Sequence, residues 1–422
     1  MFRWIRCFSY IHKCSNNHHQ SSLMKASMIS IGNYSIGSTI TNRLFSTSNI
    51  KNNPTLQEPL NTTKHYENHV PVLVKQCCEL LKRSSELEPI NSEITTQHRK
   101  HIATRGNKKS AKKINHDKSE HEQLLFIDAT FGAGGYTREI LKMYPNSKVI
   151  GIDTDYYSNP VIQQHEKLIH DTFGKERLEV HGVNFRNLKQ LVEEKIIPNL
   201  DAKQKIIGTH VIDGIVFDLG VSSMQLDYGH RGFSFLRDGP LDMRMNAMDD
   251  QCPTAREVVN NMSELDLRMI IAKFGEDENA SKIAKAIVNY RSHVKPFETT
   301  LELANLIESI TPFSDRKKKK IHPATKTFQA IRIYVNDELG ALATALQASR
   351  DILKLNTGRL VVVSYHSLED RIAKEFIKEN HLYFKKVTKE LVTPDEEEIE
   401  TNVRSRSAKL RCAQRTGVVD NE

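Results

Sequence analysis

The strongest constraint on the fold is a short apolar run that ends in an acidic residue and recurs along the chain. Residues 124–127 are followed by Asp128, residues 148–152 by Asp153, and residues 214–217 by Asp218. Continuous apolar strands separated by helical segments are typical of a parallel sheet that is covered on both faces. The sequence therefore predicts an α/β fold with a doubly wound, mostly parallel sheet and an acid at the end of several strands.

Other segments extend or interrupt this rhythm. Residues 178–180 and 360–363 fit two further buried strands, and residues 403–412 are expected to supply a last edge strand. Residues 228–325 are loop-rich at first and then mainly helical, with apolar residues at helical spacing. They predict a helical subdomain inserted into the sheet domain. A long helix is expected from Thr327 to about Leu353, with apolar residues along one face.

The formal net charge of +8 is concentrated in two segments, and the first of these is the start of the chain. No acid precedes Glu58, whereas that stretch holds six Lys or Arg, and the first fifty residues hold ten serines. A basic, Ser-rich and acid-free segment is typical of a mitochondrial transit peptide. Residues 1–57 are therefore predicted to be a leader, cut after Phe45 close to Arg43, and the mitochondrial matrix is the expected location. The alternative is a disordered polar tail without a targeting role.

The second basic segment is a polar insertion at residues 84–122. Residues 91–120 carry eight Lys or Arg against three acids, with few large apolar side chains. Such a segment cannot bury enough apolar surface to order itself. We expect a flexible basic loop, either solvated or in contact with RNA.

The sequence predicts neither a metal site nor a membrane-spanning segment. The four cysteines after the leader are Cys77, Cys78, Cys252 and Cys412, and they form no CxxC pair and have no histidine at metal-ligand spacing. No metal site or disulfide is therefore predicted. No stretch reaches the roughly 18–20 apolar residues that a membrane span needs, and no membrane partner is expected.

A glycine-rich turn follows the first strand. A dinucleotide-binding turn has the pattern G-x-G-x-x-G, but here Gly132 and Gly134 are followed by Thr137 at the third glycine position. S-adenosylmethionine needs close backbone approach, which glycines allow, and a carboxylate for its ribose hydroxyls. Asp153 is placed for that carboxylate, and Asp218 is expected near the transferred methyl. The alternative is that these are ordinary turns at strand ends.

Several long strings resemble the MraW/RsmH family. They are residues 126–137 (FIDATFGAGGYT), 213–246 (DGIVFDLGVSSMQLDYGHRGFSFLRDGPLDMRMN), 274–291, 322–339 (HPATKTFQAIRIYVNDEL) and 358–372 (GRLVVVSYHSLEDRI). The resemblance runs from about His69 to Arg415, apart from the insertion. It implies an S-adenosylmethionine-dependent methyltransferase acting on the exocyclic N(4) amine of a cytosine in small-subunit ribosomal RNA. The leader makes the chain similar to the mitochondrial branch.

The resemblance also implies the architecture and the partners. The fold implied is a class I methyltransferase, a Rossmann-like sheet with an inserted helical subdomain. Residues 58–227 and 326–422 would then be the two parts of the methyltransferase domain, with residues 228–325 as the substrate-recognition insert. The expected partner is small-subunit ribosomal RNA or the assembling mitochondrial small ribosomal subunit, and a homodimer is a further expectation.

Site residues follow from the resemblance position by position. The cofactor contacts implied are Gly134, Gly135, Tyr136, Asp153, Phe185, Asp218 and Gln225. Tyr136 stands where the family usually has histidine, and Asn246 where aspartate is common. Transfer to an amine also needs a proton acceptor. Our hypothesis is that catalysis is mainly positioning, with Asp218 or Asp242 orienting the amine.

Candidate substrate residues are aromatic or basic side chains in the same strings. They are Phe233, Phe235, Arg237, His322, Lys326, Arg332, His366 and Arg371. The two phenylalanines would stack on a flipped base, or one of them would belong to the core. The basic residues would contact RNA phosphate, or would cap helices and pair on the surface. In the second case, Ser367 would cap the helix that follows residue 364.

The sequence is also compatible with three other functions, to different degrees. Methylation at ring carbon 5 of cytosine would need a cysteine nucleophile, for which Cys252 is the candidate. A ribosome-assembly factor that only binds RNA would have no use for the glycine turn and the strand-end acids. A nicotinamide oxidoreductase is disfavoured by the broken glycine pattern.

Overall fold

The computed structural model describes residues 71–82, 123–200, 208–313, 316 and 321–419. The predicted leader and the insertion at 84–122 lie outside these residues. The described residues belong to one compact unit, His69–Glu422. Within them, no helix combines the length and apolarity needed to span a membrane.

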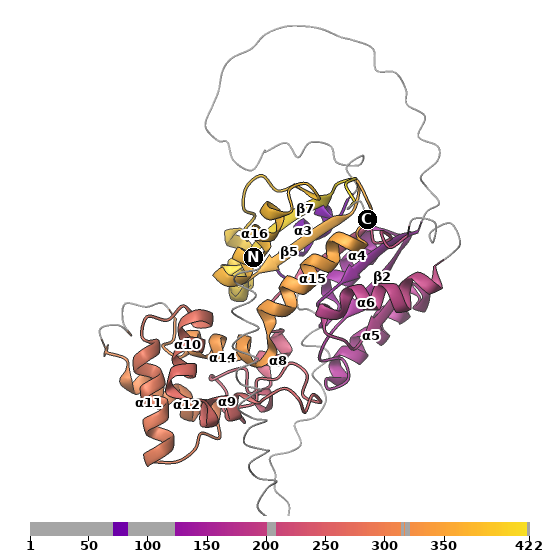
Figure 1. The fold of residues 1–422 in the computed structure, drawn as a ribbon. Coiled ribbons are helices and arrows are strands. Elements are labelled where there is room, and N and C mark those ends of the chain that lie inside the picture. Colours follow the sequence, from indigo (N-terminus) through magenta and orange to yellow (C-terminus); the bar gives the residue numbers. More distant parts are fainter. Residues whose placement is uncertain (1–70, 83–122, 201–207, 314–315, 317–320, 420–422) are drawn as a thin grey trace, which may run out of the picture. The chain divides into compact units, whose positions relative to one another are not determined.

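A seven-stranded sheet forms the centre of the described fold (Figure 1). In spatial order the strands are β3 (Leu178–His181), β2 (Ser147–Ile152), β1 (Leu124–Asp128), β4 (Gly214–Asp218), β5 (Arg359–Ser364), β7 (Lys409–Arg415) and β6 (Phe384–Lys386). The first five are parallel, and β7 runs antiparallel to both of its neighbours. The predicted mostly parallel sheet is confirmed, and the strand order reverses beside β1, where open sheets bind ligands.

The prediction of a final edge strand at residues 403–412 is wrong in its position. Residues 403–407 form a short turn of helix, η6, and the strand begins at Lys409. This strand lies between β5 and β6, so Leu410 and Cys412 are fully buried. The edge itself is β6, whose three residues are too few to give a recognisable alternating pattern.

The helices form two groups, of which the first packs around this sheet. The helices of the sheet domain are α3 (Val74–Leu80), α4 (Gly135–Met143), α5 (Pro160–Phe173), α6 (Leu188–Leu191), α8 (Ser223–Asp227), α15 (Glu338–Ile352), α16 (Ser367–Glu379) and α17 (Glu396–Thr401). Helix α15 packs against α6 and α16, whereas α3 packs against α4.

A second group of helices lies between β4 and β5 in the chain (Figure 1). It consists of α9 (Ala255–Asn261), α10 (Glu264–Gly275), α11 (Ala280–His293), α12 (Thr300–Ile310) and α14 (Thr325–Asn336). Helix α10 packs against both α11 and α14, and α11 packs against α12. Ile270, Ile271, Ile283 and Ile287 are almost completely buried, as their helical spacing predicts.

Local sequence signals set where several helices begin. Thr254 with Glu257 and Thr299 with Glu302 form reciprocal capping boxes at the starts of α9 and α12. At α16 the cap is His366, whose ring accepts from the Glu369 amide, and not Ser367, which was the alternative interpretation of this string. Ser367 is instead the first residue of that helix.

The predicted single helix from Thr327 to Leu353 is two helices. Asp337 separates α14 from α15 with a left-handed backbone, φ 45° and ψ 45°. Aspartate tolerates this conformation better than most residues, and Arg186 donates to both its carbonyl and its carboxylate. The apolar periodicity continues across the break, which is why the pattern alone predicts one helix.

Candidate active site

The glycine turn between β1 and α4 is shaped by packing as well as by backbone conformation. Gly134 has φ 71°, and a Cβ there would lie 2.5 Å from the Ile169 side chain and 3.0 Å from Phe131. A Cβ on Gly135 would lie 2.1 Å from Pro71. Only glycine satisfies both the left-handed backbone and this close approach. The turn therefore presents bare backbone at the carboxyl end of β1.

Asp153 fixes this turn from the neighbouring strand. Its Oδ2 accepts from the Gly132 amide and its Oδ1 from the Asp155 amide, each at 2.8 Å. Burial raises the pKa of Asp153 to about 6, although both backbone hydrogen bonds oppose the shift. Each carboxylate oxygen has a second lone pair, so the half-buried group can still accept from vicinal hydroxyls. The residues present thus fit the ribose end of S-adenosylmethionine.

Asp128, the last residue of β1, lies directly before the glycine turn and is fully buried. It accepts from the Thr137 hydroxyl at 2.7 Å and from the Thr130 amide at 3.4 Å. Burial raises the pKa of Asp128 to about 6. Its contacts tie the start of α4 to the end of β1, which is a structural task.

Asp218 completes the group of acids at this edge of the sheet. The Asp218 amide donates to Thr130 Oγ1 at 2.8 Å, which joins the ends of β4 and β1. Its Oδ1 accepts from the Tyr365 hydroxyl at 2.7 Å. Burial raises the pKa of Asp218 to about 7, the Tyr365 hydrogen bond opposes this, and the charges of Asp128 and Glu369 add to it. A carboxyl with such a pKa can exchange protons near neutral pH.

The other predicted cofactor residues lie close to these acids. The Phe185 ring meets Phe217 edge-on, with centroids 5.8 Å apart, at the ends of β3 and β4. Gln225 is buried in α8 and donates to Asp155 at 3.4 Å, two residues after Asp153. The buried Tyr136 ring donates its hydroxyl to the Val72 carbonyl. Its side chain is thus used in packing against α3, and its backbone remains for the cofactor.

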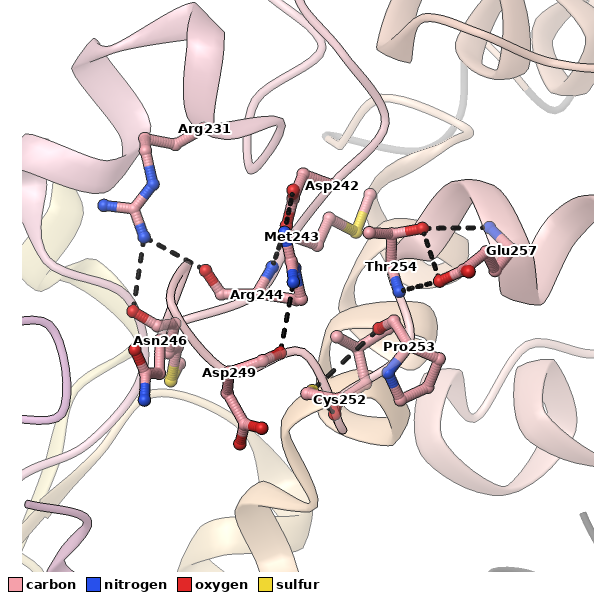
Figure 2. A network of polar contacts seen from close by, with 12 residues as sticks. Arg231, Asp242, Met243, Arg244, Asn246, Asp249, Cys252, Pro253, Thr254 and Glu257 are labelled. Atoms are coloured by element: carbon pink, nitrogen blue, oxygen red, sulfur yellow. Dashed lines mark hydrogen bonds and ion pairs between the residues drawn. The ribbon is translucent and has the colours of Figure 1, made fainter. Parts of the chain in front are cut away.

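Asp242 lies in a separate polar network (Figure 2). Both of its carboxylate oxygens pair with the Arg244 guanidinium, at 2.9 and 3.0 Å. Arg244 also donates to the Asp249 carbonyl, and Arg231 donates to the Arg244 and Met245 carbonyls. This arrangement holds the loop before α9 together. It favours Asp218 over Asp242 as the group that meets the amine.

Arg231 links that loop to the acid cluster. Its guanidinium is largely buried and pairs with Asp155 at 2.6 Å. It also lies 5.8 Å from the Phe233 ring centroid. Phe233 is 6% exposed, which agrees with the core alternative for one of the two phenylalanines.

Two of the predicted substrate residues, Phe235 and His322, lie side by side. Their rings stack with centroids 4.6 Å apart, and Phe235 also meets Phe328 at 5.0 Å. Both Phe235 and His322 are half-buried. Arg237 is exposed nearby in the chain and donates to the Asp227 carbonyl. This aromatic pair is the candidate base platform.

Glu276 connects two further predicted residues, and no sequence pattern marks it as a site residue. Its carboxylate accepts from Arg371 at 2.9 Å and from the Ser367 hydroxyl, and its carbonyl accepts from Lys326 at 2.8 Å. Glu276 ends α10 with a left-handed backbone, φ 46°. The contact joins the inserted helices to the start of α16. Arg371 and Lys326 are thus drawn together, from different helices.

The two remaining predicted residues, Arg332 and His366, lie against carboxylates. Arg332 pairs with Glu338 through two hydrogen bonds, at 2.7 and 2.9 Å. His366 lies 3.2 Å from the Glu369 carboxylate. Burial would raise the pKa of Glu369, but its contacts with His366 and Arg332 outweigh burial and hold the pKa below its usual range.

Among the described residues, the cysteines are not placed as nucleophiles and no group of side chains could hold a metal ion. The Cys252 thiol donates to the Val335 carbonyl at 2.9 Å, and burial raises its pKa to about 11. Cys77, Cys78 and Cys412 are buried thiols. The described part of the chain contains no group of three metal-ligating side chains.

A substitution in the glycine turn tests its packing. We expect Gly134→Ala to lower the free energy of unfolding by roughly 2–5 kcal/mol, because left-handed strain costs about 1–2 kcal/mol and overpacking about 1–3. Gly208→Ala is the matched control, since Gly208 has φ 73° but nothing within 4 Å of a Cβ. Urea-induced unfolding would compare the two. Equal losses in both variants would mean that the contacts with Ile169 and Phe131 are not limiting.

The fold and the site define a class of enzyme. The strand order, with an antiparallel β7 beside β5, is that of a class I methyltransferase. The glycine turn and the strand-end acids lie where such a sheet binds its ligand. The model of the MraW methylase family matches residues 66–416. The chain belongs to this family, and S-adenosylmethionine is its methyl donor.

Curated relatives agree with this family. The ribosomal RNA small subunit methyltransferase H of Parvibaculum lavamentivorans is 42% identical over 309 residues, covering 69% of this chain and 84% of that protein. The proteins of the same name from the Wolbachia of Drosophila simulans and from Rickettsia rickettsii are each 43% identical. They cover 69% and 68% of this chain, and 92% and 91% of their own lengths. A solved rRNA methylase from Streptococcus thermophilus, at 13% identity and a TM-score of 0.28 over 70% of this chain and 87% of its own, adds nothing to this assignment.

Proposed function

We propose that the chain transfers a methyl group from S-adenosylmethionine to the exocyclic N(4) amine of a cytosine in small-subunit ribosomal RNA. The names of the relatives support small-subunit ribosomal RNA as the substrate. The observation that carries the choice of an amine is the half-buried Asp218 carboxyl at the end of β4. Its pKa of about 7 suits a group that accepts a proton from a nitrogen.

The residues of the chain would have the following roles in the reaction. S-adenosylmethionine supplies a methyl group activated on a sulfonium. The glycine turn lets the backbone approach closely, and Asp153 accepts from ribose hydroxyls. Asp218 accepts a hydrogen bond from the base amine, orients its nitrogen and receives the proton that it loses. The stacked rings of Phe235 and His322 offer a flat surface for the base.

Transfer to ring carbon 5 is the weaker alternative. That route adds a cysteine thiolate to the base. The Cys252 thiol is bound to the Val335 carbonyl, and burial holds its pKa at about 11, so it is protonated at neutral pH. It also belongs to the loop before α9, and not to the edge of the sheet where Asp153 and Asp218 end their strands.

Mass spectrometry of small-subunit ribosomal RNA from cells with and without the protein tests the proposal. We expect one N(4)-methylated cytosine to disappear when the protein is absent. The wild-type gene and Cys252→Ala should both restore it, because no covalent step uses the thiol. An unchanged spectrum would refute the proposal. Loss of a 5-methylcytosine, with no rescue by Cys252→Ala, would favour the alternative.

We also propose that the protein works in the mitochondrial matrix, on the ribosome there. The support is the basic, acid-free composition of residues 1–57. Fusing residues 1–57 to a fluorescent protein should send it to mitochondria, with the leader removed. A fusion that stays in the cytosol would contradict the location and leave the chemistry untouched.

A further inference from the structure

We propose that Tyr365 is a positioning residue for Asp218, a role that rests on the proposed function. Its hydroxyl donates to Asp218 Oδ1 at 2.7 Å. Among the described residues no hydrogen bond reaches Oδ2 of the same carboxylate. Tyr365 thus holds one oxygen in place while the other is kept for the base amine.

The Tyr365 side chain is held firmly enough to do this. It follows β5 directly, and its amide donates to the Glu369 carboxylate at 2.9 Å. Glu369 is 2% exposed and is itself held by His366. The Tyr365 ring lies beside Gly220, where a Cβ would be in ordinary van der Waals contact with it, 3.7 Å away. The hydroxyl is therefore aimed by contacts from two elements.

The electrostatics around Asp218 give this hydrogen bond its importance. Asp128 on β1 and Glu369 on α16 are acids whose charges raise the pKa of Asp218, in addition to burial. Tyr136 on α4 and Cys77 on α3 are neighbours whose pKa values are raised well above their usual ranges by burial, so both are neutral. The Tyr365 hydrogen bond acts in the opposite direction to the acids, because it stabilises the ionised carboxylate.

The proton balance of the reaction explains why this matters. The amine nitrogen forms a bond to the methyl carbon while the carbon–sulfur bond breaks and its electrons stay on sulfur. The nitrogen then carries one proton too many, and this proton passes to Asp218 Oδ2 and afterwards to water. Only the ionised form of Asp218 can receive it. Tyr365 keeps its own proton throughout, since its pKa is raised well above its usual value by burial and by Asp218.

The test is Tyr365→Phe, which removes the hydroxyl and keeps the ring. Loss of a hydrogen bond to a charged group should raise the pKa of Asp218 by about one unit. The single-turnover rate at saturating S-adenosylmethionine should fall about tenfold below pH 7 and recover at high pH. Affinity for the cofactor should stay within about twofold. Tyr144→Phe is the matched control, since the buried Tyr144 hydroxyl donates to the Cys78 carbonyl at 2.8 Å and Tyr144 lies at the end of α4 opposite the glycine turn.

A second readout does not depend on the reaction. Carbon NMR of the protein labelled at aspartate carboxyls follows the Asp218 titration directly, with Asp218→Asn to identify the signal. An upward shift in Tyr365→Phe and none in Tyr144→Phe would support the proposal, even if the methyl acceptor proved to be a different base. An unmoved titration would overturn it, whatever the rates. If wild-type protein forms no N(4)-methylcytosine but the titration shifts, the proposed function fails and the positioning of Asp218 by Tyr365 stands.

Discussion

Replacing Asp218 by asparagine is expected to lower the single-turnover rate by about two to four orders of magnitude at saturating cofactor, the usual contribution of a proton acceptor. Asparagine keeps the size and one acceptor oxygen, so the Tyr365 hydroxyl can still donate to it. What is lost is the ability to take up a proton. Rapid-quench measurement of methyl transfer to small-subunit RNA gives the rate, and calorimetry gives the cofactor affinity.

The pH dependence of the same rate gives the sign of the effect. Asp218 must be ionised, so the wild-type rate should rise with pH up to about 7 and then level off. The residual rate of Asp218→Asn should not follow this limb. The folded-state pKa is raised, so the stability that this group contributes is present below its unfolded pKa and is lost as the pH rises through about 7. At pH 8 the variant should therefore be at least as heat-stable as the wild type.

Asp242→Asn serves as the comparison variant. Asp242 is fully engaged with Arg244, so its replacement should loosen the loop before α9 and weaken RNA binding more than the chemical step. A normal rate in Asp218→Asn at saturating cofactor would eliminate Asp218 as proton acceptor. A large rate loss in Asp242→Asn alone would move the role to Asp242.

The sequence predicts the sheet well because each strand can be recognised from its own short run of residues. The strands before Asp128, Asp153 and Asp218 are buried on both faces, so each is a continuous apolar run that no surface element imitates. The three carboxyls meet because the carboxyl ends of parallel strands share one edge.

What the sequence does not predict depends on contacts between distant residues. The bond from Tyr365 to Asp218 spans 147 positions, and the contacts of Glu276 reach Arg371, 95 positions away. No spacing rule links such pairs. The helix break at Asp337 is hidden for a similar reason, since the left-handed residue is stabilised by Arg186, 151 positions earlier. Basic residues in these strings look available for phosphate until their acidic partners are seen.

The second large effect, on stability, is expected at Arg332, a residue that the sequence suggested as an RNA contact. Its side chain is 14% exposed and that of its partner Glu338 is 9% exposed. We expect Arg332→Met to lower the free energy of unfolding by about 3–5 kcal/mol, because it leaves a buried carboxylate without its partner. Arg371→Met is the matched control. Its pair with Glu276 is about 40% exposed on both sides, so its loss should cost about 1 kcal/mol or less.

A double variant separates a structural role for Arg332 from phosphate binding. Arg332→Met combined with Glu338→Leu removes both charges, and most of the lost stability should return, since apolar pairs often replace buried ion pairs at little cost. The salt dependence of RNA binding should be the same for the double variant and the wild type. A phosphate contact would instead lower the slope of log affinity against log salt by about one. A lower slope with unchanged stability would therefore assign Arg332 to the RNA, and restored stability with an unchanged slope assigns it to the joint between α14 and α15.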